Sequence, residues 1–242
     1  MNNYSDLTHT THVNILKTIL EEPKSLKVIA KILGVSRPEI SRHISKLRDL
    51  SLVKKDDSLN TITLLGDLIL EILAPLEFII QHYDFFVEHP LVNFPSEFIY
   101  GLGKLQNSQL IIGAGNIIQR FIQKAEEAHD ELRIILQSPM PNTAKVVYNK
   151  GYFIVPGEAK LPSFQHETLS KELISYEFRK LTEINYEIVL LENKYGLINF
   201  PDKSGLPDNN YGFYTENKET LRFIRAFWDY YWEKSDKFLK YP

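Results

Sequence analysis

Basic side chains recur between residues 37 and 55 of this 242-residue chain at spacings that suit contact with a polyanion. Arg37, Arg42 and Lys46 fall within one predicted helix, and Lys54 and Lys55 follow it closely. A guanidinium group can donate hydrogen bonds to O6 and N7 of one guanine at the same time, and an ammonium group can pair with a phosphate. The alternative is a solvated face, because any amphipathic surface helix turns its polar residues outward. The elements that carry these side chains decide between the two interpretations.

The segment from Leu26 to Leu47 predicts two helices joined by a tight turn. Gly34 follows the first apolar stretch, where a helix end needs a residue that tolerates a positive φ. Ser36 is then a suitable N-cap for the second helix, with Glu39 completing a capping box and Pro38 inside the first turn. The apolar residues that recur at helical spacing in the first helix are Val28, Ile29, Ile32 and Leu33.

The second predicted helix has one apolar face and one polar face. Ile40, Ile44 and Leu47 share the apolar face, and Arg42 lies almost opposite them on a wheel of about 100° per residue. A basic face that begins at a helix N-terminus, which itself favours phosphate, suits the major groove of DNA.

Two short alternating runs follow the second helix, Leu52–Lys55 and Thr61–Leu64, with the polar turn Asp56–Ser58 between them. This pattern predicts a β-hairpin beside the helices, which is the wing of a winged helix-turn-helix. We therefore expect an α+β domain that binds double-stranded DNA. The expected contact residues are Ser36, Arg37, Pro38, Ser41, Arg42, Ser45, Lys46, Lys54 and Lys55.

Residues 8 to 65 resemble the winged-helix domains of the broad ArsR/MarR-like group, whose recognition helices often read much like Val35–His43. The rest of the chain is similar to the effector part of archaeal methanogenesis-regulatory proteins and their archaeal relatives. The resemblance implies a transcription regulator with a C-terminal effector domain. The second likeness rests on Asp84–His89, Phe94–Pro95, Gly103–Leu105, Gly196–Asp202, Gly212–Thr215 and Phe227–Trp232.

Composition indicates a globular protein, because 43% hydrophobic and 12% aromatic residues can fill a core. The absence of cysteine excludes disulfides, thiolate metal sites and cysteine nucleophiles, and it suits a reducing cytoplasm. We expect no membrane span, because no stretch approaches about 18 uninterrupted apolar residues. Charge is uneven along the chain: residues 1–57 hold ten basic and seven acidic residues, and the remainder holds 18 and 24. A local basic footprint on an acidic protein fits DNA contact at one face.

Residues 66–89 carry an apolar stripe with the spacing of a helix that packs against another helix. Pro75 interrupts this stripe and is expected to kink or divide the helix. The stripe suits a homodimer seam, which would place two recognition helices about 34 Å apart. The alternative is packing of the helix on its own effector domain, and the stripe is wide enough for both. Its members are Ile69, Ile72, Leu76, Ile79, Tyr83 and Phe86.

Beyond Pro90, strand-like and helical segments alternate, which predicts an α/β domain with a central mixed sheet. The expected helices are Asn116–His129, Leu169–Leu181 and one that starts near Asn217. The expected strands are Leu110–Ile112, Arg133–Gln137, Ala144–Tyr148, Tyr152–Val155, Glu187–Leu191 and Leu197–Phe200.

The search for catalytic and cofactor motifs is negative. Gly113-Ala114-Gly115-Asn116 follows a strand and opens a helix, but Ile118 stands where a dinucleotide fingerprint needs its third glycine. None of the seven histidines stands in a metal-ligand pattern, and the pair His9 and His12 near a predicted helix end suits solvent exposure better than ligation. We therefore expect no enzyme activity, no cofactor and no metal. Candidate ligand contacts near strand ends are Gly115, Asn116, Ser138, His166 and Tyr214.

The sequence thus predicts a cytoplasmic homodimeric transcription regulator that binds a near-palindromic operator. We expect a winged helix-turn-helix at residues 1–65, a linker or dimerisation helix at 66–90 and an α/β effector domain at 91–242. The effector domain would sense a small molecule. The alternative is a constitutive DNA-binding assembly module without an effector, and an enzyme tethered to DNA is a third interpretation that lacks a catalytic constellation.

Overall fold

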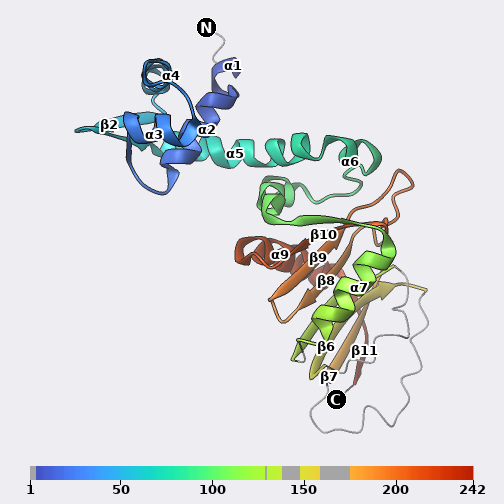
Figure 1. Ribbon diagram of the computed structural model, residues 1–242. Coiled ribbons are helices and arrows are strands. Elements are labelled where there is room, and N and C mark those ends of the chain that lie inside the picture. The colour runs from blue at the N-terminus through green and yellow to red at the C-terminus, as the bar shows by residue number, and fades with distance from the viewer. Residues whose placement is uncertain (1–3, 129, 138–147, 159–174, 242) are drawn as a thin grey trace. The chain divides into compact units, whose positions relative to one another are not determined.

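The computed structural model describes residues 4–128, 130–137, 148–158 and 175–241 (Figure 1). The chain divides into two compact units, Met1–Phe78 and Ile79–Pro242, and each is described by itself. Within the described residues, no helix combines the length and the apolar character needed to cross a membrane.

The first unit is a helical domain with a small antiparallel sheet of order β1-β3-β2. Its core is formed where α2, α3, α4 and the wing strands meet, and residues such as Ile15, Leu16 and Ile44 are completely buried there. The elements are α1 (Tyr4–Leu7), α2 (Thr10–Leu20), β1 (Lys24–Ser25), α3 (Leu26–Leu33), α4 (Arg37–Asp49), β2 (Val53–Asp56), β3 (Leu59–Ile62) and the start of α5 (Leu64–Gln81). The predicted winged helix-turn-helix is therefore confirmed.

The turn between α3 and α4 has the expected backbone. Gly34 ends α3 with φ 66°, and its amide donates to the carbonyl oxygen of Ala30. Ser36 takes the N-cap position of α4 in extended conformation, but its side chain makes no capping hydrogen bond, so the predicted capping box does not form. Of the apolar residues predicted to share one face of α3, Ile29 is buried in the core, whereas Val28 and Ile32 are exposed.

The junction between the wing and α5 is closely packed. The Thr63 amide donates to the carbonyl oxygen of Leu52 at 3.0 Å, and the Thr63 hydroxyl donates to that of Ser51 at 2.7 Å. The Gly66 amide donates to Thr63 Oγ1 at 3.1 Å. A Cβ at Gly66 would lie 2.4 Å from the Leu52 carbonyl oxygen and 2.8 Å from Ile62 Cγ1, so the helix can approach the wing this closely only with glycine there.

The second unit is built on an eight-stranded sheet of order β11-β7-β6-β5-β8-β9-β10-β4. Strands β5, β6 and β7 pair in parallel and the other neighbours are antiparallel, which confirms the predicted mixed sheet. The strands are β4 (Gln109–Ile112), β5 (Glu131–Ile135), β6 (Lys150–Pro156), β7 (Ser175–Leu181), β8 (Glu187–Leu191), β9 (Tyr195–Asn199), β10 (Tyr211–Thr215) and β11 (Asp236–Tyr241). The helices are α6 (Tyr83–Glu88), the 3₁₀ helix η1 (Ser96–Asn107), α7 (Ala114–Ala125) and α9 (Lys218–Lys234).

Helices α7 and α9 cover opposite faces of this sheet, as Figure 1 lets the reader follow. On β5, Leu132 packs in the cluster that includes Ala125 of α7, whereas the neighbouring Arg133 lies 4.8 Å from the ring of Trp228 on α9. Successive strand residues point to opposite faces, so this alternation places one helix on each side. Asn217 caps α9 by accepting from the amides of Glu219 and Thr220, at the predicted start of that helix.

Besides the capping box, some predicted elements differ in the structure. Residues 175–181 of the predicted helix Leu169–Leu181 form the strand β7, because Tyr176 and Phe178 alternate into the core and the strand pairs with β6 and β11. The preceding residues of that prediction, and 144–147 of the predicted strand Ala144–Tyr148, lie outside the described residues. Helix α5 continues through Pro75, so of the two expected outcomes, a kink or a division, the division does not occur.

Candidate DNA interface and ligand groove

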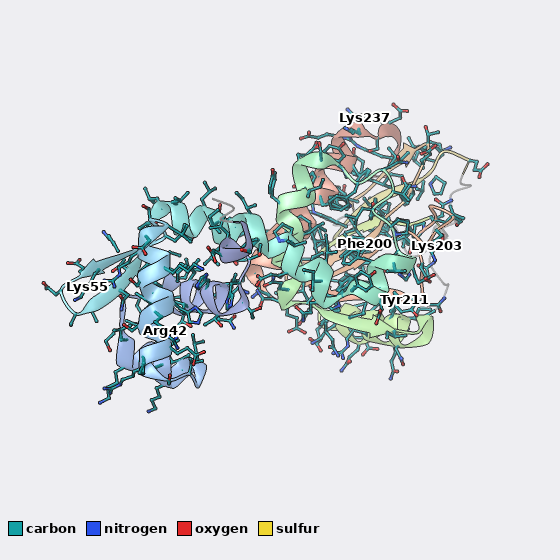
Figure 2. All side chains as sticks on the ribbon, turned by 90° about the horizontal axis from the view of Figure 1, so that it is seen from above. Arg42, Lys55, Phe200, Lys203, Tyr211 and Lys237 are labelled. Carbon is teal, nitrogen blue, oxygen red and sulfur yellow. The ribbon has the colours of Figure 1, made fainter. Side chains whose placement is uncertain are left out.

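Helix α4 presents a polar face that is open to solvent. Ile40, Ile44 and Leu47 are completely buried, so the helix has a fixed rotation about its axis. Arg42 projects from this helix in Figure 2. The predicted contact residues that the structure leaves exposed on or next to α4 are Ser36, Arg37, Pro38, Ser41, Arg42, Ser45 and Lys46.

The cations on α4 differ in their surroundings. Within the described residues of the first unit, Arg37 and Arg42 form no ion pair, so both guanidinium groups keep their donors for a ligand. Lys46 instead pairs with Asp6 of α1, with 2.5 Å between Nζ and Oδ1. The charge of Lys46 is therefore partly neutralised within the protein before any DNA binds.

The wing carries the other two predicted contacts. Lys54 pairs in register with Thr61, and Lys55 with Asn60, across the antiparallel strands β2 and β3. Both lysines are exposed, and Lys55 is labelled on the wing in Figure 2. Neighbouring residues of a strand point to opposite faces, so the two ammonium groups leave the hairpin on different sides. The side chain of Asn60 is buried and donates to the Lys24 carbonyl oxygen at 3.1 Å, which ties the wing to β1.

Three histidines come together at the start of α2 and the middle of α4. One nitrogen each of His9, His12 and His43 lies within 4.8 Å of the others. His12 is buried, and its Nδ1 lies 2.6 Å from the carbonyl oxygen of Asp6. His9 is the N-cap of α2, and its Nδ1 accepts from the Thr11 amide at 3.2 Å. No metal site was predicted from the sequence, where His43 is distant from the other two histidines.

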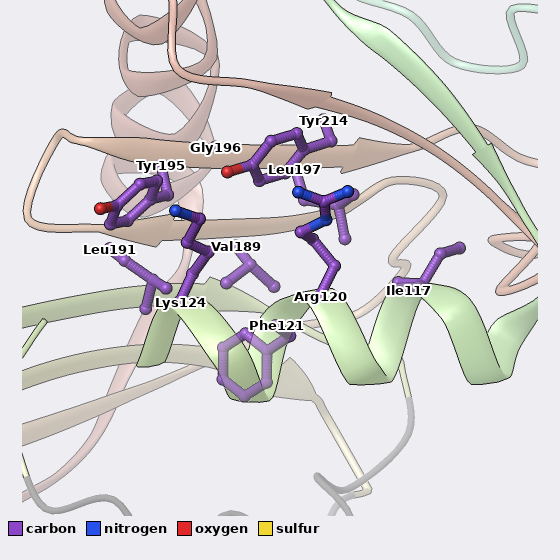
Figure 3. Close-up of a pocket in the computed structure, with 10 residues that line it drawn as sticks. All are labelled: Ile117, Arg120, Phe121, Lys124, Val189, Leu191, Tyr195, Gly196, Leu197 and Tyr214. Carbon is purple, nitrogen blue, oxygen red and sulfur yellow. The ribbon is translucent and has the colours of Figure 1, made fainter. Parts of the chain in front are cut away.

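The second unit has a groove between α7 and the strands β8, β9 and β10, shown in Figure 3. Its space of about 290 Å³ includes volume open to solvent, so it is a shallow surface groove and not an enclosed pocket. The floor is apolar, with Val189, Leu191 and Leu197 among its residues. Arg120 and Lys124 extend from α7 toward the strands, as Figure 3 shows.

Each groove cation lies over a tyrosine ring. Arg120 Cζ is 5.2 Å from the ring centre of Tyr214, and Lys124 Nζ is 4.5 Å from that of Tyr195. Lys124 also pairs with Glu127 at 3.1 Å. Arg120 forms no ion pair among the described residues. Arg120 is thus the groove cation that remains open to an anionic ligand.

The tyrosine hydroxyls of the groove are held by carboxylates. Tyr195 donates to Glu127 Oε2 at 2.7 Å, and Tyr214 donates to Glu216. The hydrogen bonds from Tyr195 and Lys124 lower the pKa of Glu127. Burial, together with the bond to Glu216, raises the pKa of Tyr214. Both tyrosines therefore stay neutral, and the groove offers a ligand aromatic faces and a guanidinium group.

The predicted ligand contacts do not all gather at this groove. Tyr214 lines it, but the described lining does not include Gly115 or Asn116, which are exposed in the first turn of α7. The Asn116 amide is used inside that turn, where Nδ2 donates to the Ile112 carbonyl oxygen at 2.7 Å. Ser138 and His166 lie outside the described residues. Arg120 and Lys124 are not among the predicted ligand contacts, although their spacing of four residues places them side by side on a helix.

Comparisons with known proteins gave a family match in the first unit and similar solved structures over larger parts of the chain. Residues 9–55 match the family model of the bacterial regulatory proteins of the arsR family. Among solved structures, TrmBL2, an archaeal chromatin protein, is similar with a TM-score of 0.40 and 11% identity over 94% of each chain. NucT from Helicobacter pylori is similar with a TM-score of 0.40 and 10% identity, over 54% of this chain and 98% of that chain. No curated protein gave a match. Over residues 9–55, the first unit is thus similar to the helix-turn-helix domain of the arsR family of bacterial regulatory proteins.

Proposed function

We propose that this protein binds a near-palindromic operator as a homodimer, and that its α/β unit senses a small molecule. The observation that carries the DNA-binding part is the exposed Arg42, which lies opposite the buried face of α4 and has no ion-pair partner among the described residues. An unpaired guanidinium group can reach both acceptors of guanine in the major groove. Arg37 adds a second free cation near the start of the same helix.

The homodimer is supported by an apolar stripe on α5. Leu65, Leu68, Ile72 and Leu76 have exposed fractions of 46%, 50%, 46% and 41%, and they recur every three or four residues. Such spacing puts them on one face of a helix. A continuous apolar face of this kind marks an interaction site more often than ordinary surface. A second copy of the same helix would cover it and set the distance between two α4 helices.

Effector sensing is supported by the groove on α7. Its apolar floor suits a hydrocarbon or aromatic body, and the free guanidinium group of Arg120 suits a carboxylate or phosphate. We therefore propose a small ligand with an apolar body and one anionic group. Such a ligand would regulate DNA binding only if its affinity differs between two states of the protein.

Selection of duplexes from a random pool tests the DNA-binding part. We expect enrichment of an inverted repeat with half-sites about 10 base pairs apart, because a dimer places its two recognition helices about one turn of DNA apart. Enrichment of a single asymmetric site would contradict the homodimer. A pool without any enriched sequence would contradict specific binding.

Thermal unfolding and operator binding in the presence of benzoate or octanoate test the sensing part. We expect one of these probes to stabilise the full-length chain and to change its operator affinity by about 5- to 150-fold. Arg120→Gln should abolish both effects, and Arg222→Gln, an exposed cation on α9, should preserve them. Stabilisation without any change in operator affinity would contradict sensing, and a lack of response to both probes would favour the constitutive assembly module.

A further inference from the structure

His12 presents an unused nitrogen inside the first unit. Its Nδ1 lies 2.6 Å from the Asp6 carbonyl oxygen, and because a carbonyl can only accept, Nδ1 carries the proton. In the neutral ring, Nε2 then has a free lone pair. Nε2 is buried and has no hydrogen-bond partner among the residues that the structure describes. Buried polar atoms are almost always paired, so this lone pair points to a missing cation or donor.

Two further imidazole rings lie beside the ring of His12. The ring of His9 lies 4.9 Å from that of His12, and the ring of His43 lies 5.0 Å from it, between centroids. The three candidate ligand nitrogens are within 4.8 Å of one another. Zinc–nitrogen bonds of about 2.1 Å separate two tetrahedral ligands by about 3.4 Å, so ring shifts of roughly 1 Å close the site. His9 is exposed and can make such a shift by giving up its cap on Thr11.

We propose that His9, His12 and His43 bind a divalent transition-metal ion that joins the start of α2 to helix α4. Imidazole nitrogen suits Zn²⁺, Ni²⁺, Cu²⁺ and Co²⁺, whereas Mg²⁺ and Ca²⁺ prefer oxygen ligands. Three protein ligands leave the fourth tetrahedral position to water.

The surroundings of the three rings support this assignment. The bond from His12 Nδ1 to a backbone carbonyl is the arrangement that orients a metal-binding histidine and fixes its tautomer. Asp6 is in turn held by its ion pair with Lys46 of α4.

Calorimetric titration of the tag-free full-length protein with Zn²⁺, in a buffer that does not chelate metals, tests the site. We expect one ion per chain, with affinity reduced about tenfold or more in His9→Gln and in His43→Gln. These two variants avoid the completely buried His12, so both should keep the fold. Co²⁺ should give a visible absorption spectrum of a nitrogen-ligated tetrahedral ion in the wild type, and His43→Gln should abolish it.

His82→Gln is the matched control, because all histidines of the first unit belong to the cluster and His82 lies in the second unit. We expect this variant to bind Zn²⁺ like the wild type. Zn²⁺ should also raise the temperature of unfolding of the wild type and not that of His43→Gln. Equal Zn²⁺ affinity in the wild type, His9→Gln and His43→Gln would overturn the proposal, as would an equal loss of affinity in His82→Gln.

Discussion

Lys46 on the recognition helix α4 and Asp6 on α1 form an ion pair, with 2.5 Å between Nζ and Oδ1. This contact holds the ammonium group next to a carboxylate on the protein itself. Asp6→Asn should free Lys46 for a phosphate and raise affinity for duplex DNA, because one more basic group can then release a counterion. Fluorescence anisotropy with a labelled operator measures this change. Asp49→Asn removes the same charge from the end of α4, so an equal gain in both variants would indicate a general charge effect.

Arg42 is expected to read a base edge. Arg42→Ala should lose about 1–3 kcal/mol of discrimination between operator and random DNA. Arg48→Ala removes an exposed cation from the last turn of the same helix and should weaken binding to both DNAs alike. Equal losses on operator and random DNA in Arg42→Ala would reassign Arg42 to a phosphate contact, and unchanged binding to both would remove it from the interface.

The two wing lysines should contribute unequally, because they leave the hairpin on opposite sides. We expect the double variant Lys54→Ala/Lys55→Ala to reduce the slope of log affinity against log salt by about 0.9, the value for one phosphate contact. Measurements on the two single variants should show which lysine causes this reduction in slope. A reduction by about 1.8, shared equally between the single variants, would show that both contact phosphates.

The exposed stripe on α5 leads to a prediction about assembly. Ile72→Glu with Leu76→Glu should convert a dimer into a folded monomer, because both side chains are exposed in the single chain and a buried unpaired carboxylate would disfavour the interface. Analytical ultracentrifugation measures the mass, and circular dichroism checks the fold. Glu71→Gln, at an exposed position of the same helix, should leave the dimer intact. A monomeric mass for the wild-type protein would contradict the homodimer.

Zinc should strengthen DNA binding if the three histidines hold it. The ion would add positive charge beside Arg42 on α4, and basic charge at the contact face favours phosphate. Anisotropy titrations with and without Zn²⁺ should show tighter operator binding for the wild type and no change for His43→Gln. Zn²⁺-dependent binding that persists in His43→Gln would contradict a role for this cluster.

The first unit could be predicted from sequence because its signals are local. Gly34 ends α3 in the left-handed conformation that the turn requires, and the spacing of Ile40, Ile44 and Leu47 sets the rotation of α4. The wing was predicted as a hairpin around one short polar turn, but its second strand is Leu59–Ile62 and not Thr61–Leu64, because Leu64 begins α5. The histidine cluster was not accessible, because its third member reaches the other two only through the packing of α2 against α4.

The second unit was harder to predict because its sheet is assembled from distant segments. In β7, Tyr176 and Phe178 face the core, while Arg179 Nε donates to Glu177 Oε1 at 3.1 Å on the other face. This alternating run is short and follows residues with helical spacing, so its local sequence does not favour a strand over a helix. Pairing with β6 and β11 decides the conformation. In the groove, Tyr214 could be proposed as a polar residue near a strand end. Arg120 belongs to a different element, which lies beside Tyr214 only in the folded protein.

The glycine at the start of α5 has a mechanical consequence. Gly66 allows the helix backbone to pack directly against Leu52, and Thr63 forms hydrogen bonds with the same loop. The connection between α5 and the wing is therefore rigid. We expect the first turns of α5 and the hairpin to move together as one rigid body. A small rotation of α5 would then displace the wing, and with it the exposed side chain of Lys55.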